Sequence, residues 1–260
     1  MKRYYDVPLL KKPVWTWEVP LYFFVGGAAG AAAMIGVAAD LGGAKRTLVR
    51  DARRVAAVGA MLSTPLLIAD LGRPERFLNM LRVFKPQSPM SVGAWTLAIF
   101  GGASTAAAAG IAKRPASLVS AATGLVMATY TGVLIGATTI PIWKKHAATL
   151  PIHFGASALA SAASLLELLG HDDTALAALA SVAAAAETGI GWRIEARGGV
   201  DVTTRIGGIF SGPLPLILRL LGTRSRNARE AAAASALLGS LITRIAWIEA
   251  GKKSAESSTP

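Results

Sequence analysis

An acid and two arginines stand where a long apolar stretch of the sequence ends. Residues 55–69 contain no charged side chain, and Asp70 to Phe77, DLGRPERF, follow directly. A carboxyl at the edge of an apolar helix can exchange protons with a buried ligand, and Arg73 beside it could hold the carboxylate charged or orient it. Helix capping or interfacial anchoring is the alternative explanation for these charges.

Other polar and aromatic residues are expected at the same boundary. Glu18 opens an apolar run within WTWEVPLYFF, and Trp95 closes SPMSVGAW. Tyr130 lies two to three turns before another apolar run ends near residue 142. If successive runs cross a membrane in alternating directions, these segments and Asp70 meet at one face. The predicted site is therefore an apolar pocket that contains a carboxyl, a phenol and indoles, which is a functional candidate at membrane depth. The indoles could equally be interfacial anchors.

The elements that must position these residues are long apolar helices. Hydrophobic residues make up 53% of the 260 residues, charged residues only 16%, and the mean hydropathy is +0.47. Soluble domains have about 25% charged residues. A soluble all-α protein is the less favoured alternative. With about 20 residues needed per membrane crossing, the sequence predicts an all-α integral membrane protein with eight transmembrane helices, at 19–40, 54–71, 89–112, 116–142, 150–170, 173–193, 205–222 and 229–250.

Charge and residue counts exclude several classes of function. The net charge of +12 comes from Lys and Arg placed mostly between apolar runs, which indicates membrane topology rather than nucleic-acid binding. The chain contains no Cys, so it cannot hold a thiolate-bound iron–sulfur cluster. His146 and His171 fall in loops and His153 starts a span, so no pair is placed to bind haem. We expect a haem-free chain without its own metal, its histidines at the surface or interface, and its first apolar run retained as a span.

The motifs resemble those of a known family. DLGRPERF followed by FKPQSPMSVGAW is similar to the signature of the NrfD/PsrC-like family, the membrane subunits of polysulfide-reductase-type complexes. WTWEVPLYFFVGGAAG and the triplet from Tyr130 to Gly132 resemble it too, so the likeness covers residues 15–140. It implies two four-helix bundles, no haem, and a quinone site facing an iron–sulfur, ferredoxin-like partner subunit. It also implies a molybdenum- or tungsten-bis-pterin catalytic subunit and a bacterial or archaeal cytoplasmic membrane.

The same resemblance implies roles for particular residues. Asp70 matches the acid that ends the family's second helix, which is associated with the quinone and with proton transfer. Tyr130 matches a fourth-helix tyrosine that approaches the quinone head group. Some relatives have a histidine on the first helix, where this chain has Phe23, Phe24 or Glu18. The expected catalytic residues are Asp70 and Tyr130, and the expected binding set for menaquinone or ubiquinone is Glu18, Phe23, Asp70, Arg73, Trp95 and Tyr130.

The domain plan and a second polar set complete the expectations. Residues 1–18 are an interfacial segment, 19–142 the first bundle with the quinone site, 143–250 the second bundle, and 251–260 a disordered tail. Residues 75–84 are expected to form a short interfacial helix. A proton route through Glu187, Arg193 and Arg244, with Asp40, Glu167 and Glu249 as further candidates, competes with inter-helix ion pairing. The stretch GGIFSGPLPL, a broken helix, leaves open an ion- or solute-translocating module without quinone chemistry.

Overall fold

The computed structural model describes residues 10–71, 73, 75–222 and 225–257, and within these residues every regular element is a helix. Residues 1–9 of the expected interfacial segment lie outside the described residues, and residues 10–17 precede the first helix. The helices are α1 Glu18–Leu41, α2 Arg46–Asp70, α3 Glu75–Met80, α4 Pro89–Ala109, α5 Lys113–Gly136, α6 Pro141–Lys145, α7 Leu150–Leu168, α8 Thr174–Arg197, α9 Val202–Ser211, α10 Pro213–Leu221 and α11 Arg226–Glu256.

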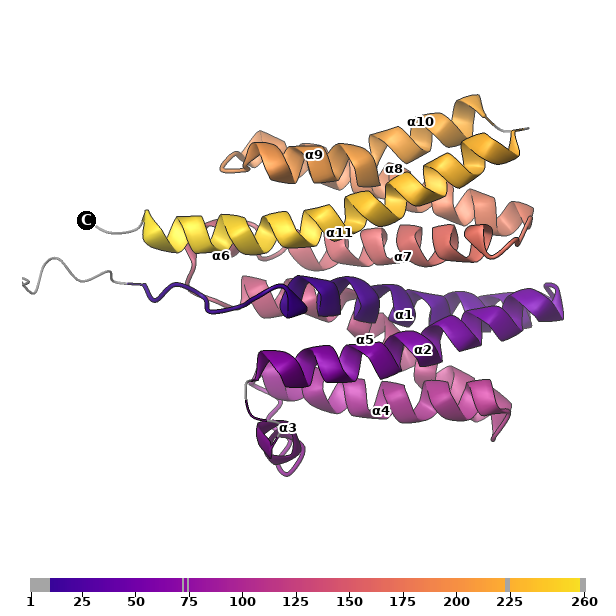
Figure 1. Ribbon diagram of the computed structural model, residues 1–260, viewed down its shortest axis with the longest axis horizontal. Helices are drawn as coiled ribbons and strands as arrows, with labels where there is room; N and C mark the ends of the chain where they lie inside the picture. The colour runs from indigo at the N-terminus through magenta and orange to yellow at the C-terminus, as the bar shows by residue number, and fades with distance from the viewer. Residues whose placement is uncertain (1–9, 72, 74, 223–224, 258–260) are drawn as a thin grey trace, which may run out of the picture.

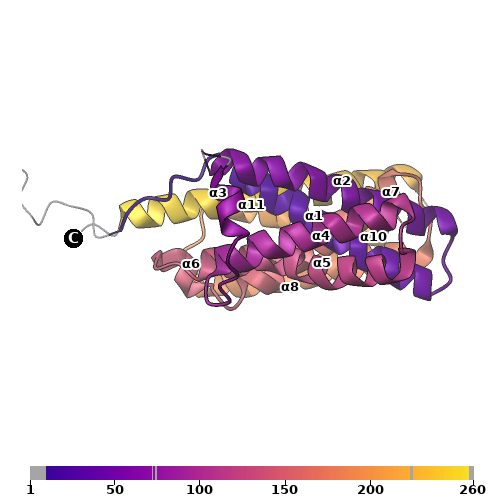
Figure 2. The ribbon, with the colours of Figure 1, turned by 90° about the horizontal axis from the view of Figure 1, so that it is seen from below.

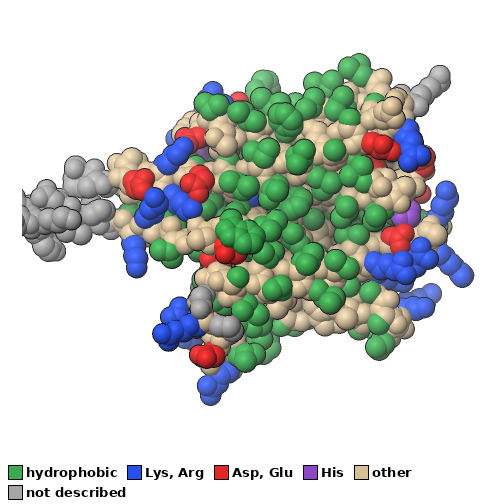
Figure 3. Space-filling view, in the orientation of Figure 1, with side chains coloured by type: hydrophobic (Ala, Val, Ile, Leu, Met, Phe, Trp, Pro, Cys, Tyr) green, Lys and Arg blue, Asp and Glu red, His purple; other side chains and the backbone are tan. Residues whose placement is uncertain are grey.

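Six of these helices are long and apolar enough to cross a membrane: α1, α2, α4, α5, α8 and α11. Figure 3 shows the matching surface, with hydrophobic side chains over the middle of the face and charged side chains at its two ends. A membrane core has no water to satisfy exposed backbone groups, so helices that satisfy their own are the expected spanning elements. The chain is therefore an all-helical, multi-pass membrane protein.

The helices form two groups that meet along α1 (Figures 1 and 2). Helices α1, α2, α4 and α5 pack against one another, and α7 to α11 form the other group. Helix α1 contacts both α7 and α11, and α5 also contacts α7. The approach of α1 to α5 depends on glycine, because a Cβ on Gly30 would lie 2.3 Å from the carbonyl oxygen of Gly124. Small residues are the usual means of close helix packing in membranes.

The predicted seventh span is broken into two helices. Helix α9 ends at Ser211 and α10 begins at Pro213, whose missing N–H and fixed φ favour a helix start. Gly212 lies between them, where a Cβ would be 2.8 Å from the Thr188 hydroxyl oxygen. The break therefore presses closely against α8.

The expected tail is wrong for the residues that the structure describes. Helix α11 continues through Glu256, whereas residues 251–260 were expected to be disordered; residues 258–260 lie outside the described part. Gly251 is buried against the Trp143 indole, and Lys12 Nζ lies 2.5 Å from a Glu256 carboxylate oxygen. These contacts with residues far away in the sequence stabilise the last turns of α11. The expected helix at 75–84 is present but shorter, as α3, and α6 lies across the expected domain boundary at 142–143.

Candidate functional site

The first pocket lies among α1, α2, α4 and α5, at the end of the molecule where the described chain begins and ends. It brings together three of the residues predicted from the sequence, namely Phe23, Asp70 and Tyr130. Its open volume is about 30 Å³, roughly one water molecule. The remaining lining is mostly apolar: Trp15, Val19, Tyr22, Leu66, Leu67, Leu71, Met80, Met90, Ala94 and Leu134.

Tyr130 is buried on α5, with 6% of its surface exposed. A Cβ on Gly93 would lie 2.1 Å from the Tyr130 ring carbon Cζ, so only glycine leaves room for this ring position. Among the described residues, the Tyr130 hydroxyl has no hydrogen-bond partner. The glycine of the SPMSVGAW motif therefore places a phenol in the pocket with its hydrogen-bonding capacity free.

Asp70 is the last residue of α2 and is half-buried at the pocket. Its carboxylate makes no hydrogen bond or ion pair within the described part of the chain. Glu18 lies close enough for the two negative charges to interact, and it accepts a hydrogen bond from the Thr16 hydroxyl. Glu18 itself does not line the pocket.

Arg73 and Trp95 lie outside the pocket lining. Arg73 is exposed after α2 and forms no ion pair with Asp70 among the described residues. The Trp95 ring instead contacts Phe84 edge-on at 6.2 Å between centroids. The sequence predicted both at the end of the molecule that holds the first pocket, but Arg73 is exposed there and Trp95 packs against Phe84.

Tyr22, Met80 and Met90 line the first pocket and were missed from the sequence. Val19, Tyr22 and Phe23 are spaced i, i+3 and i+4, so they share one face of α1. That spacing could have identified Tyr22 once Phe23 was a candidate. Met90 belongs to the SPMSVGAW motif, which could have pointed to it, whereas Met80 on α3 meets the pocket only through the fold.

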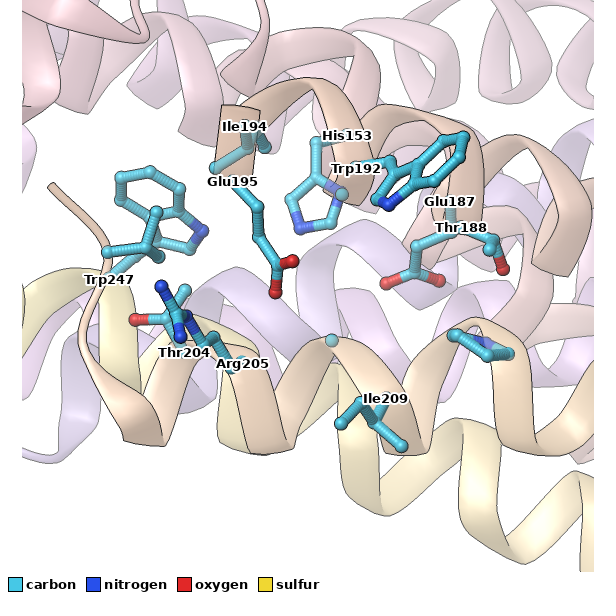
Figure 4. A pocket seen from close by; sticks show the side chains of 14 residues that line it. His153, Glu187, Thr188, Trp192, Ile194, Glu195, Thr204, Arg205, Ile209 and Trp247 are labelled. Carbon is cyan, nitrogen blue, oxygen red and sulfur yellow. The ribbon is translucent and has the colours of Figure 1, made fainter. Parts of the chain in front are cut away.

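The second pocket is larger, about 420 Å³, and lies among α7, α8, α9 and α11 (Figure 4). Its buried polar residues are His153, Glu187 and Thr204, and Trp247 forms part of its wall. Glu195 and Arg205 line it where it opens to the surface. Glu187 is the one member of the predicted proton route that lines this pocket.

Arg244 is fully buried beside the second pocket. Its guanidinium donates to the Ser157 hydroxyl at 3.0 Å, to the Ser240 carbonyl at 2.9 Å and to the Phe154 carbonyl at 3.3 Å. It interacts electrostatically with Glu187. Arg193, by contrast, is exposed on α8 and is not part of the lining. Two of the three predicted route residues are thus neighbours.

The further polar candidates form the ion pairs that were the alternative expectation. Arg53 pairs with Asp40 at 2.8 Å, Arg219 with Glu167 at 2.6 Å, and Lys252 with Glu249 at 2.7 Å. Only the pair between Arg219 and Glu167 is buried on both sides. These contacts give Asp40, Glu167 and Glu249 a structural role.

The histidines are less exposed than the sequence indicated. His146 and His153 are buried, at 0% and 3% exposure, and His171 pairs with Asp51 at 3.2 Å. His146 follows α6, packs edge-on against Trp247 at 5.4 Å between centroids, and lies 3.3 Å from the Gly198 carbonyl oxygen. Burial lowers the pKa of His146, so its ring is neutral at pH 7. The prediction that His146 and His153 lie at the surface or interface was wrong, because the packed ends of α7 and α11 enclose them.

Fold and sites together define a class: a multi-pass membrane protein with a mostly apolar pocket in each group of helices. The chain belongs to the polysulfide reductase family NrfD, whose sequence profile NrfD_2 matches residues 1–257. The resemblance is confirmed and extends beyond residues 15–140. A comparison with curated proteins returned no match. Membership makes the chain a membrane subunit of the oxidoreductase type.

Proposed function

We propose that this chain exchanges electrons between the membrane quinone pool and an iron–sulfur partner subunit, with the quinone bound in the first pocket. The observation that supports this is the meeting of Asp70 and Tyr130 in one apolar pocket, each without a hydrogen-bond partner among the described residues. Unpaired polar groups at membrane depth are costly and indicate a function. The family supports the same reading.

The full membrane topology is part of this proposal. Helix α7 has 19 residues, and α9 with α10 together have a similar length, which at 1.5 Å per residue gives nearly 30 Å. That length suffices to cross a hydrocarbon core. We therefore propose eight crossings in two bundles, the first of α1, α2, α4 and α5, the second of α7, α8, α9 with α10, and α11.

The residues of the first pocket fit a quinone in chemistry, although the space is narrow. A bound quinone would accept two electrons and two protons, and a bound quinol would supply them. Tyr130 can donate a hydrogen bond to one ring oxygen, and Asp70 can give or take a proton at the other. Phe23 and Trp15 provide flat apolar contacts. The head group needs more than the present 30 Å³ or so, and the flexible side chains of Met80 and Met90 are suited to move aside.

The partners follow from the family and from the position of the pocket. A ferredoxin-like iron–sulfur subunit would dock over α3 and the segment 81–88, beside Arg73, with a molybdenum- or tungsten-bis-pterin subunit beyond it. The quinone would be menaquinone or ubiquinone, without haem or metal in this chain, in a bacterial or archaeal cytoplasmic membrane. A proton route along Glu187, Arg193 and Arg244 is proposed with it, supported by the proximity of Glu187 and Arg244.

The test replaces Asp70 by Asn in the assembled complex and measures quinol oxidation. We expect turnover to fall about 100-fold, within the range of general acid–base catalysis, with assembly unchanged. Glu75→Gln, an exposed acid on α3, is the matched control and should keep normal turnover. Normal turnover in Asp70→Asn would reduce Asp70 to an interfacial charge. A solitary protein that moves a solute and ignores quinone would favour the translocating alternative.

A further inference from the structure

We propose that the second pocket is a separate binding site for a neutral, hydroxylated aromatic amphiphile of the hydroquinone class. Its head would be held by Glu187 and His153. The choice of ligand class rests on the proposed function, but the site itself does not. The first pocket and the second share no lining residue.

The size and walls of the second pocket suit a small amphiphile. Its volume of about 420 Å³ falls within the usual range of ligand sites, about 300 to 1,000 Å³. Most of the wall is apolar, and the side chains of Ile194, Pro213 and Trp247 supply much of it. Water alone would satisfy the polar groups, but the apolar side chains of the wall would remain in contact with water. A flat ring with hydroxyl groups covers both.

Four buried side chains in this pocket have a nitrogen or oxygen atom without a hydrogen-bond partner in the described part of the chain, and they belong to His153, Glu187, Thr204 and Trp247. Glu187 is 2% exposed, and neither of its carboxylate oxygens has a partner at full hydrogen-bond geometry, although the Ser157 and Ser211 hydroxyls lie near it. His153 is 3% exposed, and its Nδ1 atom has no partner. Figure 4 shows both side chains bordering the same space. Buried polar groups without partners are destabilising. A ligand with two hydroxyl groups could donate to both.

The charges around the pocket favour a neutral ligand. The buried guanidinium of Arg244 interacts with both Glu187 and His153, which balances the Glu187 carboxylate. At the mouth, Arg205 offsets Glu195. A cation or an anion would disturb this balance, whereas a hydroquinone would not.

The exposed residues that line the pocket come from α8 and α9, which border it in Figure 4. Trp192 and Ile209 border it and are 80% and 51% exposed. Exposed apolar side chains on helices in a membrane face lipid, so a ligand dissolved in the bilayer can enter sideways. Gly191 and Gly208 also line the pocket, and a Cβ on either would meet nothing within 4 Å.

Aromatic contacts join the two pockets. Trp15 of the first pocket stacks on Trp143 at 5.4 Å between centroids, and Trp143 donates from Nε1 to the carbonyl of Trp247 in the second. A ligand in the second pocket would touch the Trp247 side chain. The carbonyl of Trp247 holds Trp143, and Trp143 in turn packs against Trp15 in the wall of the first pocket.

The experiment uses a photoreactive short-chain quinone, in its reduced form, on the full chain in lipid nanodiscs, with cross-links mapped by mass spectrometry. We expect two labelled regions, one in α1, α2 or α5 and one in α8 or α9. Gly191→Leu should fill part of the second pocket and lower labelling of α8 and α9 about ten-fold, because the added side chain occupies space that the ligand needs. Gly189→Leu, on the same helix but outside the lining, is the matched control.

Glu187→Gln provides a second variant that keeps the side-chain size. It should lower labelling of α8 and α9 and leave labelling around Asp70 unchanged. Labelling confined to the first pocket, or α8 labelling that persists in Gly191→Leu, would overturn the second site alone. Labelling confined to α8 and α9 would support the second site and count against the proposed function. An absence of label in both regions would contradict both.

Discussion

Gly93 shows how one residue without a side chain defines the first pocket. Its Cα faces the ring of Tyr130 so closely that an added methyl group would overlap the ring carbons. In the motif SPMSVGAW, the missing side chain of Gly93 therefore matters as much as the polar residues do. The hydroxyl of Tyr130 depends on this contact for its position near Asp70.

Gly93→Ala should displace Tyr130 and lower quinol turnover about ten-fold or more, because placement of catalytic groups by about 1 Å strongly affects rate. Gly101→Ala on the same helix is the control, since a Cβ there meets nothing within 4 Å. Steady-state quinol oxidation by the assembled complex is the measurement. Equal rates in the two variants would show that the Tyr130 position is unimportant.

Asp70 and Tyr130 could be predicted as pocket residues because the motif and the alternation of spans place both at one membrane face. Arg73 and Trp95 could not be separated from them in this way. The exposure of Arg73 and the contact of Trp95 with Phe84 arise from tertiary packing, which the sequence pattern does not reveal. Burial of His146 was equally hidden, because it arises from Trp247, about 100 residues away in the sequence.

At the scale of elements, the contact between α1 and α5 relies on backbone meeting backbone. A Cβ on Gly124 would lie 2.5 Å from the carbonyl oxygen of Gly30. Neither helix can relieve such an overlap by changing a rotamer. The two helices would have to move apart, which would also open the packing around Met127.

Gly124→Ala should therefore destabilise the protein by about 1 to 3 kcal/mol, the usual cost of overpacking. Denaturation in detergent micelles, followed by tryptophan fluorescence, measures the change. Gly102→Ala, on α4 with open space around the glycine, serves as the comparison and should be neutral or slightly stabilising. A Gly124→Ala protein as stable as the original would mean that α1 and α5 are not tightly apposed.

Hydropathy predicted the long helices well, since each depends on a run of apolar residues. It placed the start of α2 too late, at residue 54, because Arg46 to Arg54 carry several charges. The helix continues through this charged stretch, outside its apolar part, and Arg53 there pairs with Asp40. The C-terminal turns of α11 and the short α6 also escaped prediction, because tertiary packing rather than composition stabilises them.

At the scale of the molecule, Trp143 joins the two groups of helices. It is fully buried, stacks on Trp15, donates to the Trp247 carbonyl at 2.7 Å and packs over Gly251. Its neighbours come from the start of the described chain and from α11. No local sequence pattern reveals such a contact.

Trp143→Ala should cost about 3 to 5 kcal/mol, as expected for deleting a large buried aromatic side chain. Thermal unfolding in nanodiscs and protease sensitivity of residues 251–257 are the two readouts. Trp192→Ala, which removes an 80% exposed indole, should leave both unchanged. Unchanged protease sensitivity in Trp143→Ala would argue that α11 is held mainly by its contacts with α7 and α9.

The ion pair between Lys12 and Glu256 has a consequence for how the polypeptide could be rewired. Because the two residues touch, a short linker could close the backbone into a ring there. The ring could be reopened in the exposed loop 169–173, between α7 and α8. Such a circular permutant would insert α8 first and α7 last. The order in which the helices are synthesised would then change, while their final arrangement would stay the same.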